Sequence, residues 1–195
     1  MRKKTGLAAL GVLLLSLAAS AQMTVGFSLS SGIQFPKEEI YRDIYGRSMP
    51  LALEVRVGIS RSFGLAAGVE YLSDSGRALN INQGELDFPV RFRKTAYPLS
   101  GYFLLPLGQR ISLRGAAGIS FHSYREEWKD LDLSHEGSTA KPFLSAGLEY
   151  AIVARLAVYL WLRYESISTD WGPYIQREVD VGGLSLLAGL TFRIF

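Results

Sequence analysis

Residues 51–60 read Leu-Ala-Leu-Glu-Val-Arg-Val-Gly-Ile-Ser, in which an aliphatic residue occupies every second position. Successive side chains of a β-strand point to opposite faces, so this stretch would carry its large apolar side chains on one face and Glu54 and Arg56 on the other. The same period of two begins at residue 23 and recurs along most of the chain. Repeated strands of this kind predict a β-barrel with lipid against its outer face and polar side chains inside it.

The first 21 residues have the three parts of an export signal. Basic residues at 2–4 precede an apolar run over 7–18, and a small-residue cleavage motif follows at 19–21. The apolar run is shorter than the roughly 20 residues that a membrane-spanning helix needs. We therefore expect a cleaved signal peptide at 1–21, one barrel domain at 22–195, and export to the outer membrane of a Gram-negative-type bacterium.

Charge and cysteine content exclude several classes of function. Of the 21 basic side chains, Arg2, Lys3 and Lys4 fall in the signal, and the remaining 18 match the 18 acidic ones. No general attraction to nucleic acid is therefore expected. The chain has no cysteine, which excludes disulfides and thiolate metal sites. Its two histidines show no metal-ligand spacing, so neither a metal nor another cofactor is expected.

Eight segments carry the strand pattern, and the connections between them alternate in length. The expected strands are 23–35, 50–60, 65–73, 86–105, 111–122, 142–152, 155–166 and 178–195. Long polar connections fall at 36–49, 74–85, 123–141 and 167–177, and short ones fall at 61–64, 106–110 and 153–155. Outer-membrane barrels show this alternation, because their loops outside the cell are long and their periplasmic turns are short. The sequence therefore predicts an all-β, eight-stranded antiparallel up-and-down transmembrane β-barrel.

Residues 94–98, Lys-Thr-Ala-Tyr-Pro, interrupt the alternation of the fourth segment. A turn there would make two short strands, but nine strands would leave the C-terminus on the wrong side of the membrane. We prefer one long strand with a bulge near Pro98, and we expect Phe88, Val90 and Phe92 on its outward face.

The inward positions are rich in arginine and carboxylates and almost lack lysine. A soluble periplasmic sandwich or lipocalin-like barrel usually carries many surface lysines, whereas paired arginines and carboxylates suit a confined polar lumen. Eight strands leave an interior that side chains can fill, so a plug is favoured over a conducting lining. A turn centred on Phe63 would place Arg56 directly opposite Glu70. The predicted lumen charge network consists of Glu54, Arg56, Glu70, Asp87, Arg91, Arg93, Arg114, Glu149, Arg163 and Glu165.

The signal, the eight alternating segments, the loop rhythm and the C-terminal stretch 190–195 together resemble the small outer-membrane β-barrel family, of the OmpA/OmpX and porin-family type. The resemblance implies a monomer surrounded by outer-membrane lipid and lipopolysaccharide. It also implies handling by periplasmic chaperones and by the barrel-assembly machinery. Phe192 and the terminal Phe195 look like the C-terminal assembly signal, although Phe195 is one residue out of phase with the apolar row that contains Phe192.

The long loops are the remaining functional surface. Charge mixed with tyrosine and tryptophan is typical of contact surfaces, and the candidates are Tyr41, Tyr45, Trp128, Trp171 and Tyr174. These features favour a structural or surface-interaction role, with a narrow porin-like channel for small solutes as the alternative.

A lipid-modifying enzyme that uses His122 or His135 is the less favoured reading. His122 and Ser123 are adjacent on a strand and would point to opposite faces, so they cannot act together. We therefore predict no catalytic residue and no enzymatic activity.

Overall fold

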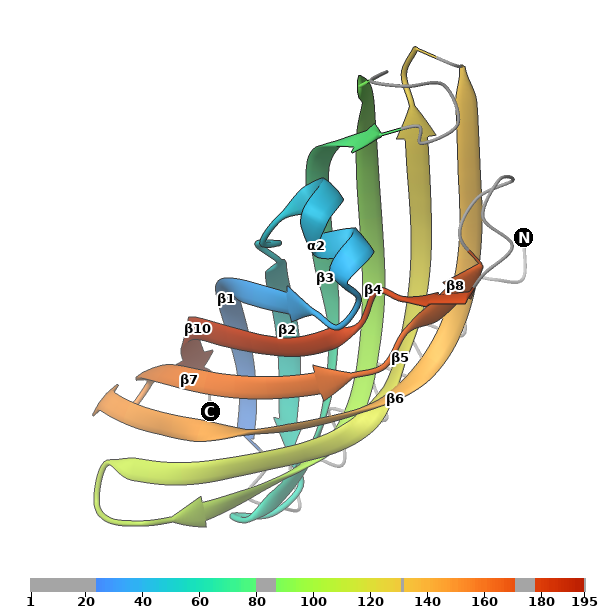
Figure 1. Ribbon diagram of the computed structural model, residues 1–195. Helices are drawn as coiled ribbons and strands as arrows, with labels where there is room; N and C mark the ends of the chain where they lie inside the picture. The colour runs from blue at the N-terminus through green and yellow to red at the C-terminus, as the bar shows by residue number, and fades with distance from the viewer. Residues whose placement is uncertain (1–23, 80–86, 131, 171–177, 195) are drawn as a thin grey trace, which may run out of the picture.

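The computed structural model describes residues 24–79, 87–130, 132–170 and 178–194. Eight antiparallel strands close into a barrel in the order β1-β10-β7-β6-β5-β4-β3-β2 (Figure 1), so the predicted fold is confirmed. The barrel strands are β1 (Thr24–Pro36), β2 (Leu51–Gly58), β3 (Phe63–Leu79), β4 (Asp87–Pro106), β5 (Ile111–Trp128), β6 (Leu133–Val153), β7 (Leu156–Glu165) and β10 (Gly183–Arg193). The predicted signal peptide at 1–21 lies outside the described residues.

Three short elements lie at one end of the barrel, which we call the upper end. Helix α2 (Glu39–Tyr45) connects β1 to β2, and strands β8 (Ser168–Asp170) and β9 (Glu178–Asp180) form a separate two-stranded sheet between β7 and β10. In the described part of the chain, α2 included, no helix has both the length and the apolar character to cross a membrane.

An apolar belt surrounds the outside of the barrel. Its aliphatic residues, such as Leu53, Leu99 and Leu160, are about half exposed because nothing in the protein covers them. Exposed aromatic rings border the belt at the upper end at Phe35, Tyr71, Tyr97, Phe121 and Tyr164, and at the lower end at Phe63, Phe103, Tyr150 and Phe192. An apolar band between two aromatic girdles is the outer surface of a barrel that sits in a bilayer.

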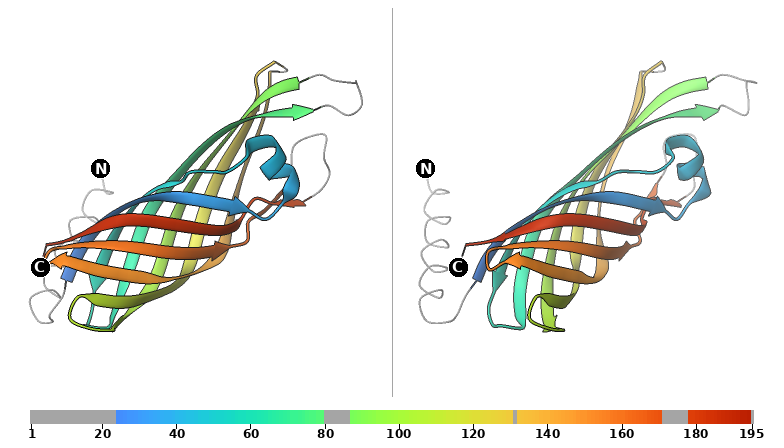
Figure 2. Two further views of the ribbon diagram at one scale, coloured as in Figure 1. Left: turned by 60° about the vertical axis from the view of Figure 1, so that its left-hand side comes forward. Right: turned by 90° about the vertical axis from the view of Figure 1, so that its left-hand side faces the viewer.

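Two hairpins continue far above the upper girdle. Strands β3 and β4 pair as far as Leu79 and Asp87, and β5 and β6 pair as far as Trp128 and Leu133. Figure 2 shows both hairpins projecting past α2. The predicted long loop at 123–141 is therefore wrong in large part, because most of these residues extend the strands, and so do residues 74–79 of the predicted loop at 74–85. Residues 80–85 lie outside the described residues.

The fourth strand is continuous, as preferred, but the bulge expected near Pro98 is absent. The register of β4 with β5 is unbroken through Tyr97, Pro98 and Leu99, and its register with β3 is the same on both sides of this point. The orientation expected for its upper half is wrong: Val90 and Phe92 are buried inside, whereas Arg91 and Arg93 face outward. Above the girdle the outside is aqueous, so the polar side chains face out and the apolar ones face in.

The turn between β2 and β3 differs from the predicted turn by two residues. Gly58 pairs with Gly64, so the turn centres on Arg61 rather than Phe63. Arg56 therefore lies opposite Ala66 and Glu70 opposite Ala52, and the predicted Arg56–Glu70 pair is wrong.

A substitution at Phe92 tests whether the apolar side chains of upper β4 face inward. Its ring packs at 5.4 Å from that of Tyr41 and 5.9 Å from that of Tyr45 under α2. We expect Phe92→Ala to lower the free energy of unfolding by about 3–5 kcal/mol, because it opens a cavity in packed protein. Urea unfolding in phospholipid vesicles measures this change. The matched control is Phe121→Ala in the upper girdle, where lipid fills the space; an equal or larger loss there would contradict the inward packing of Phe92.

Candidate functional site

The lower half of the lumen is crossed by a group of five charged side chains, which we call the lower network: Glu54, Arg56, Arg114, Glu149 and Arg193. Arg56 donates from Nη1 to Glu149 Oε2 at 2.8 Å, and its Nε lies 3.5 Å from Glu54 Oε1. Arg114 donates to Glu54 at 3.0 Å, and Arg193 also pairs with Glu149. Strands from opposite sides of the barrel are thereby joined through its interior.

Aromatic rings and hydroxyls complete the lower network. The Arg114 guanidinium stacks over the rings of Trp161 at 3.7 Å and Tyr102 at 4.6 Å. Arg56 Nη2 donates to Ser28 Oγ at 2.7 Å and also bonds Thr191. Cation–π contacts and hydroxyl acceptors stabilise guanidiniums that burial has removed from water.

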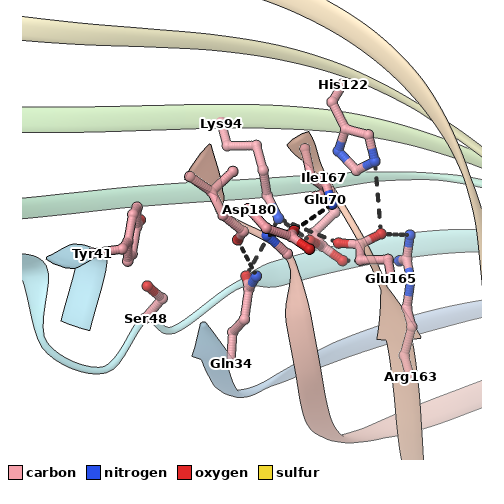
Figure 3. Close-up of polar contacts among 12 residues, drawn as sticks. Gln34, Tyr41, Ser48, Glu70, Lys94, His122, Arg163, Glu165, Ile167 and Asp180 are labelled. Atoms are coloured by element: carbon pink, nitrogen blue, oxygen red, sulfur yellow. Dashed lines mark hydrogen bonds and ion pairs between the residues drawn. The ribbon is translucent and has the colours of Figure 1, made fainter. Parts of the chain in front are cut away.

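The upper half of the lumen holds a second group, the upper network, formed by Glu70, Lys94, Arg163 and Glu165 (Figure 3). Lys94 Nζ lies 3.4 Å from a carboxylate oxygen of Glu70 and 3.4 Å from one of Glu165. Arg163 donates to Glu70 at 3.0 Å and to Glu165 at 2.9 Å. Two cations and two carboxylates alternate, so the formal charges cancel in a site whose members are all nearly inaccessible to water.

Seven predicted lumen residues are brought together in these two networks: Glu54, Arg56, Glu70, Arg114, Glu149, Arg163 and Glu165. Arg91 and Arg93 are not in the lumen, and the side chain of Asp87 lies outside the described residues. Sequence reasoning missed Lys94, the central cation of the upper network. The signal that could have found it is its place in β4, in phase with the buried Val90 and Phe92.

Little open space remains between these side chains. One cavity of about 40 Å³ lies beside Glu54, Trp161 and Arg163, and another of about 30 Å³ lies beside Arg56 and Glu149. A single water needs roughly 10–15 Å³ of such space, so each cavity has room for a few waters. The interior is therefore filled by side chains in the part of the lumen that these cavities border.

Helix α2 covers the upper end of the lumen. Tyr41 and Tyr45 are buried against Leu72 and Phe92 in an apolar cluster. Tyr41 donates to Asp74 at 2.8 Å, and Tyr45 donates to Glu126 at 2.6 Å. Burial, reinforced by the nearby carboxylates, raises the pKa of both phenols well above the ordinary value, which keeps them protonated as donors. Both tyrosines were predicted as exposed contact residues, and this placement corrects that interpretation.

Asp180 holds together the segments that follow the end of β7 and precede the start of β10. Its carboxylate accepts hydrogen bonds from the backbone N–H of Ile167 at 2.7 Å and of Gly182 at 3.0 Å, and from Ser166 Oγ at 2.7 Å. Burial alone would raise the pKa of Asp180, but these hydrogen bonds and Lys37 hold it below its usual value. These hydrogen bonds hold Ile167 in the apolar cluster beneath α2.

The remaining predicted residues are dispersed. Trp128 is half buried on the inner side of the projecting hairpins, with its ring 6.3 Å from that of Phe88. Phe192 lies exposed on the lower girdle. Trp171, Tyr174 and Phe195 lie outside the described residues.

The two histidines lie apart. His122 faces the lumen and Ser123 faces outward, as expected. The His122 imidazole is buried with Nε2 at 3.7 Å from Glu165, whereas the ring of His135 lies 6.2 Å from that of Tyr124. Neither histidine lines the two lumen cavities described above.

The upper network makes a prediction about coupling between its members. Glu70→Gln leaves Lys94 and Arg163 with one shared carboxylate, and we expect a loss of about 3–5 kcal/mol of unfolding free energy. Adding Lys94→Met should cost less than the sum of the single changes, because it removes the cation that was left unpaired. Urea unfolding of the four proteins in vesicles gives this cycle. Glu39→Gln, in the exposed Glu39–Arg42 pair of α2, is the matched control and should change stability little. If the losses of unfolding free energy in the two single variants simply add in the double variant, the proposed coupling is contradicted.

Comparison with known proteins identifies the class. No curated protein sequence matches the chain. Among solved structures, Neisserial surface protein A has a TM-score of 0.59 at 11% identity, and the N-terminal barrel domain of Pseudomonas aeruginosa OprF has 0.56 at 10%; each alignment covers 88% of this chain and 97% of the other. Ail of Yersinia pestis, solved with the heparin analogue sucrose octasulfate, has a TM-score of 0.52 at 13% identity, covering 87% of this chain and 97% of Ail. At these identities, the similarities show a shared fold. The family model described as the outer membrane protein beta-barrel domain matches residues 7–192, nearly the whole chain, and the chain therefore belongs to this outer-membrane β-barrel family.

Proposed function

We propose that this protein is a sealed outer-membrane barrel with a structural and surface-interaction role, and that it acts through its extracellular face rather than by conducting solutes. The observation that carries the proposal is the filled lumen. Two ion-pair networks cross it, and the α2 cluster of Tyr41, Tyr45 and Phe92 covers its upper end. A narrow channel is the alternative function, and it would need these contacts to open.

The energetics of the networks support a closed lumen. A solute path past the upper network would have to separate Lys94 and Arg163 from Glu70 and Glu165, which hold one another at 2.9–3.4 Å. Separating buried charges leaves each one without a partner in a poorly hydrated interior, which costs several kcal/mol. The separated state would therefore be populated only rarely.

The projecting hairpins support the surface role. Strand β2 ends its pairing with β3 at Tyr71, and β7 ends its pairing with β6 at Phe143. Among the described residues, the upper parts of β3 and β6 therefore have a barrel-strand neighbour on one side only. Beyond the parts of β3 and β6 that α2 and β8 contact, these polar sheet edges can accept an added strand from a partner protein. In this proposal the barrel anchors this four-stranded sheet above the membrane.

No catalytic step is part of the proposal. His122 is enclosed beside the upper network, and His135 packs on Tyr124. A lipid-modifying enzyme would need one of them beside a reactive group that a lipid can reach.

Planar-bilayer recording tests the sealed lumen. We expect the mature chain, folded in detergent and checked by heat-dependent gel mobility, to insert without discrete conductance steps, because the lumen charges stay paired. A porin inserted into the same bilayers shows that openings would be detected. Reproducible unitary steps from the folded protein would overturn the proposal in favour of the channel, and steps that change on Lys94→Met would assign the current to this lumen.

A further inference from the structure

Three arginines form a patch on the outward face of the projecting hairpins. Arg91 and Arg93 lie two residues apart on β4, and Arg93 is directly opposite Arg125 on β5. All three alternate with buried neighbours, so their side chains stand on the outer wall of the sheet. We call Arg91, Arg93 and Arg125 the arginine patch.

The height of the patch is set by the upper aromatic girdle. Tyr71 pairs with Thr95, and Arg93 follows two residues higher on the same strand, roughly 7 Å along it. The polar headgroup layer of a bilayer extends about 5–8 Å beyond each side of the hydrocarbon core. Arg93 and its neighbour Arg125 therefore stand at the level of lipid headgroups when the girdle sits at the edge of the hydrocarbon, and the long side chain of Arg91, two residues higher, can reach down to that level.

The patch carries more positive charge than its neighbours neutralise. Glu127 is shared by Arg93 at 3.4 Å and Arg125 at 3.0 Å, and Glu136 pairs with Arg125 at 3.2 Å. Arg91 has no ion-pair partner among the described residues, and its buried Nε has no hydrogen-bond partner there. Three guanidiniums thus face two carboxylates, and the Arg93–Arg125 cross-strand pair brings like charges together.

Glu127 already bridges Arg93 and Arg125, and an anion bound at the patch would neutralise the positive charge that remains. Guanidinium groups bind phosphate through paired N–H donors, which suits a phosphomonoester better than a zwitterionic headgroup. Small hydroxyl residues surround the patch and leave it accessible, namely Ser73, Ser75, Thr95 and Ser123.

The position of the patch selects a lipid as the source of the phosphate. On β4 the patch residues have the same facing as Tyr97 and Leu99, which lie on the apolar belt, so the patch continues the lipid-facing wall upward.

We propose that the arginine patch binds the phosphate groups of a phosphorylated glycolipid of the outer leaflet, of the lipid A type. This goes beyond the surface role proposed above and does not need a sealed lumen, so a conducting barrel would leave it standing.

Lipid retention tests the assignment. The folded protein is placed in phosphatidylcholine nanodiscs that contain either bisphosphorylated or dephosphorylated lipid A, and the lipid A that remains bound after exchange into lipid-free detergent is quantified. We expect at least tenfold greater retention of the bisphosphorylated form. Arg91→Gln should reduce this preference, and combining it with Arg93→Gln and Arg125→Gln should abolish it.

The control is Arg42→Gln on α2, because the Arg42 side chain is as exposed as that of Arg125 but stands away from the patch, and it should keep the full preference. Heat-dependent mobility shows that each variant is folded; if the triple variant does not fold, the Arg91→Gln result decides. Equal retention of the two lipid A forms would overturn the proposal. So would a preference that survives the patch substitutions, or binding of soluble sucrose octasulfate to the patch without any phosphorylated-lipid preference.

Discussion

The hydrogen-bonded seam between β1 and β10 is the interaction on which the rest of the structure depends. It runs without a register shift from the pair Gly26 and Arg193 to the pair Pro36 and Gly183. Within lipid an open sheet edge has no water to bond, so a spanning sheet must close on itself. The close approach constrains side chains as well: a Cβ on Gly32 would collide with the carbonyl oxygen of Leu186 across this seam. Closure at eight strands then fixes a narrow interior that side chains must fill.

Charged side chains fill that interior even though buried ion pairs add little net stability compared with well-packed apolar residues. Their contribution is to specify the register of the strands. A slip of one residue in β2 or β3 would turn Arg56 or Glu70 outward and an aliphatic residue into the lumen, and the same holds for the other strands that carry lumen charges. A strand with apolar side chains on both faces would lack this penalty. The two networks therefore help to specify which way each strand faces, while the belt supplies the contact with lipid.

The sequence was sufficient for the strand count, the fold class and most of the lumen charges, because strict alternation reports directly on two faces of different polarity. It was insufficient wherever the surroundings change along one strand. In β4, Leu99 faces lipid and Phe92 faces the protein interior, although both are apolar. The apolar side chains change face between these two residues, and in the sequence this change looks like an interruption of the alternation at residues 94–98. Lys94 was missed and Arg91 and Arg93 were misplaced for this reason. The predicted Arg56–Glu70 pair was wrong for a different reason. The turn between β2 and β3 centres on Arg61 and not on Phe63, and this displacement changes every pair of facing residues on the two strands. The burial of Tyr41 and Tyr45 could have been suspected from their spacing of four residues, which places them on one side of a helix.

The location of α2 in the chain constrains the order in which the barrel can be completed. The helix lies between the first two strands, yet the surface that holds it is built from Leu72, Phe92 and Tyr124 on the three strands that follow. The helix therefore has no surface to pack on until β3, β4 and β5 are in place. Until these strands are paired, the upper end of the lumen stays uncovered. Packing of α2 over the upper end of the lumen is therefore a late event in the folding of the barrel, although the helix lies near the start of the chain.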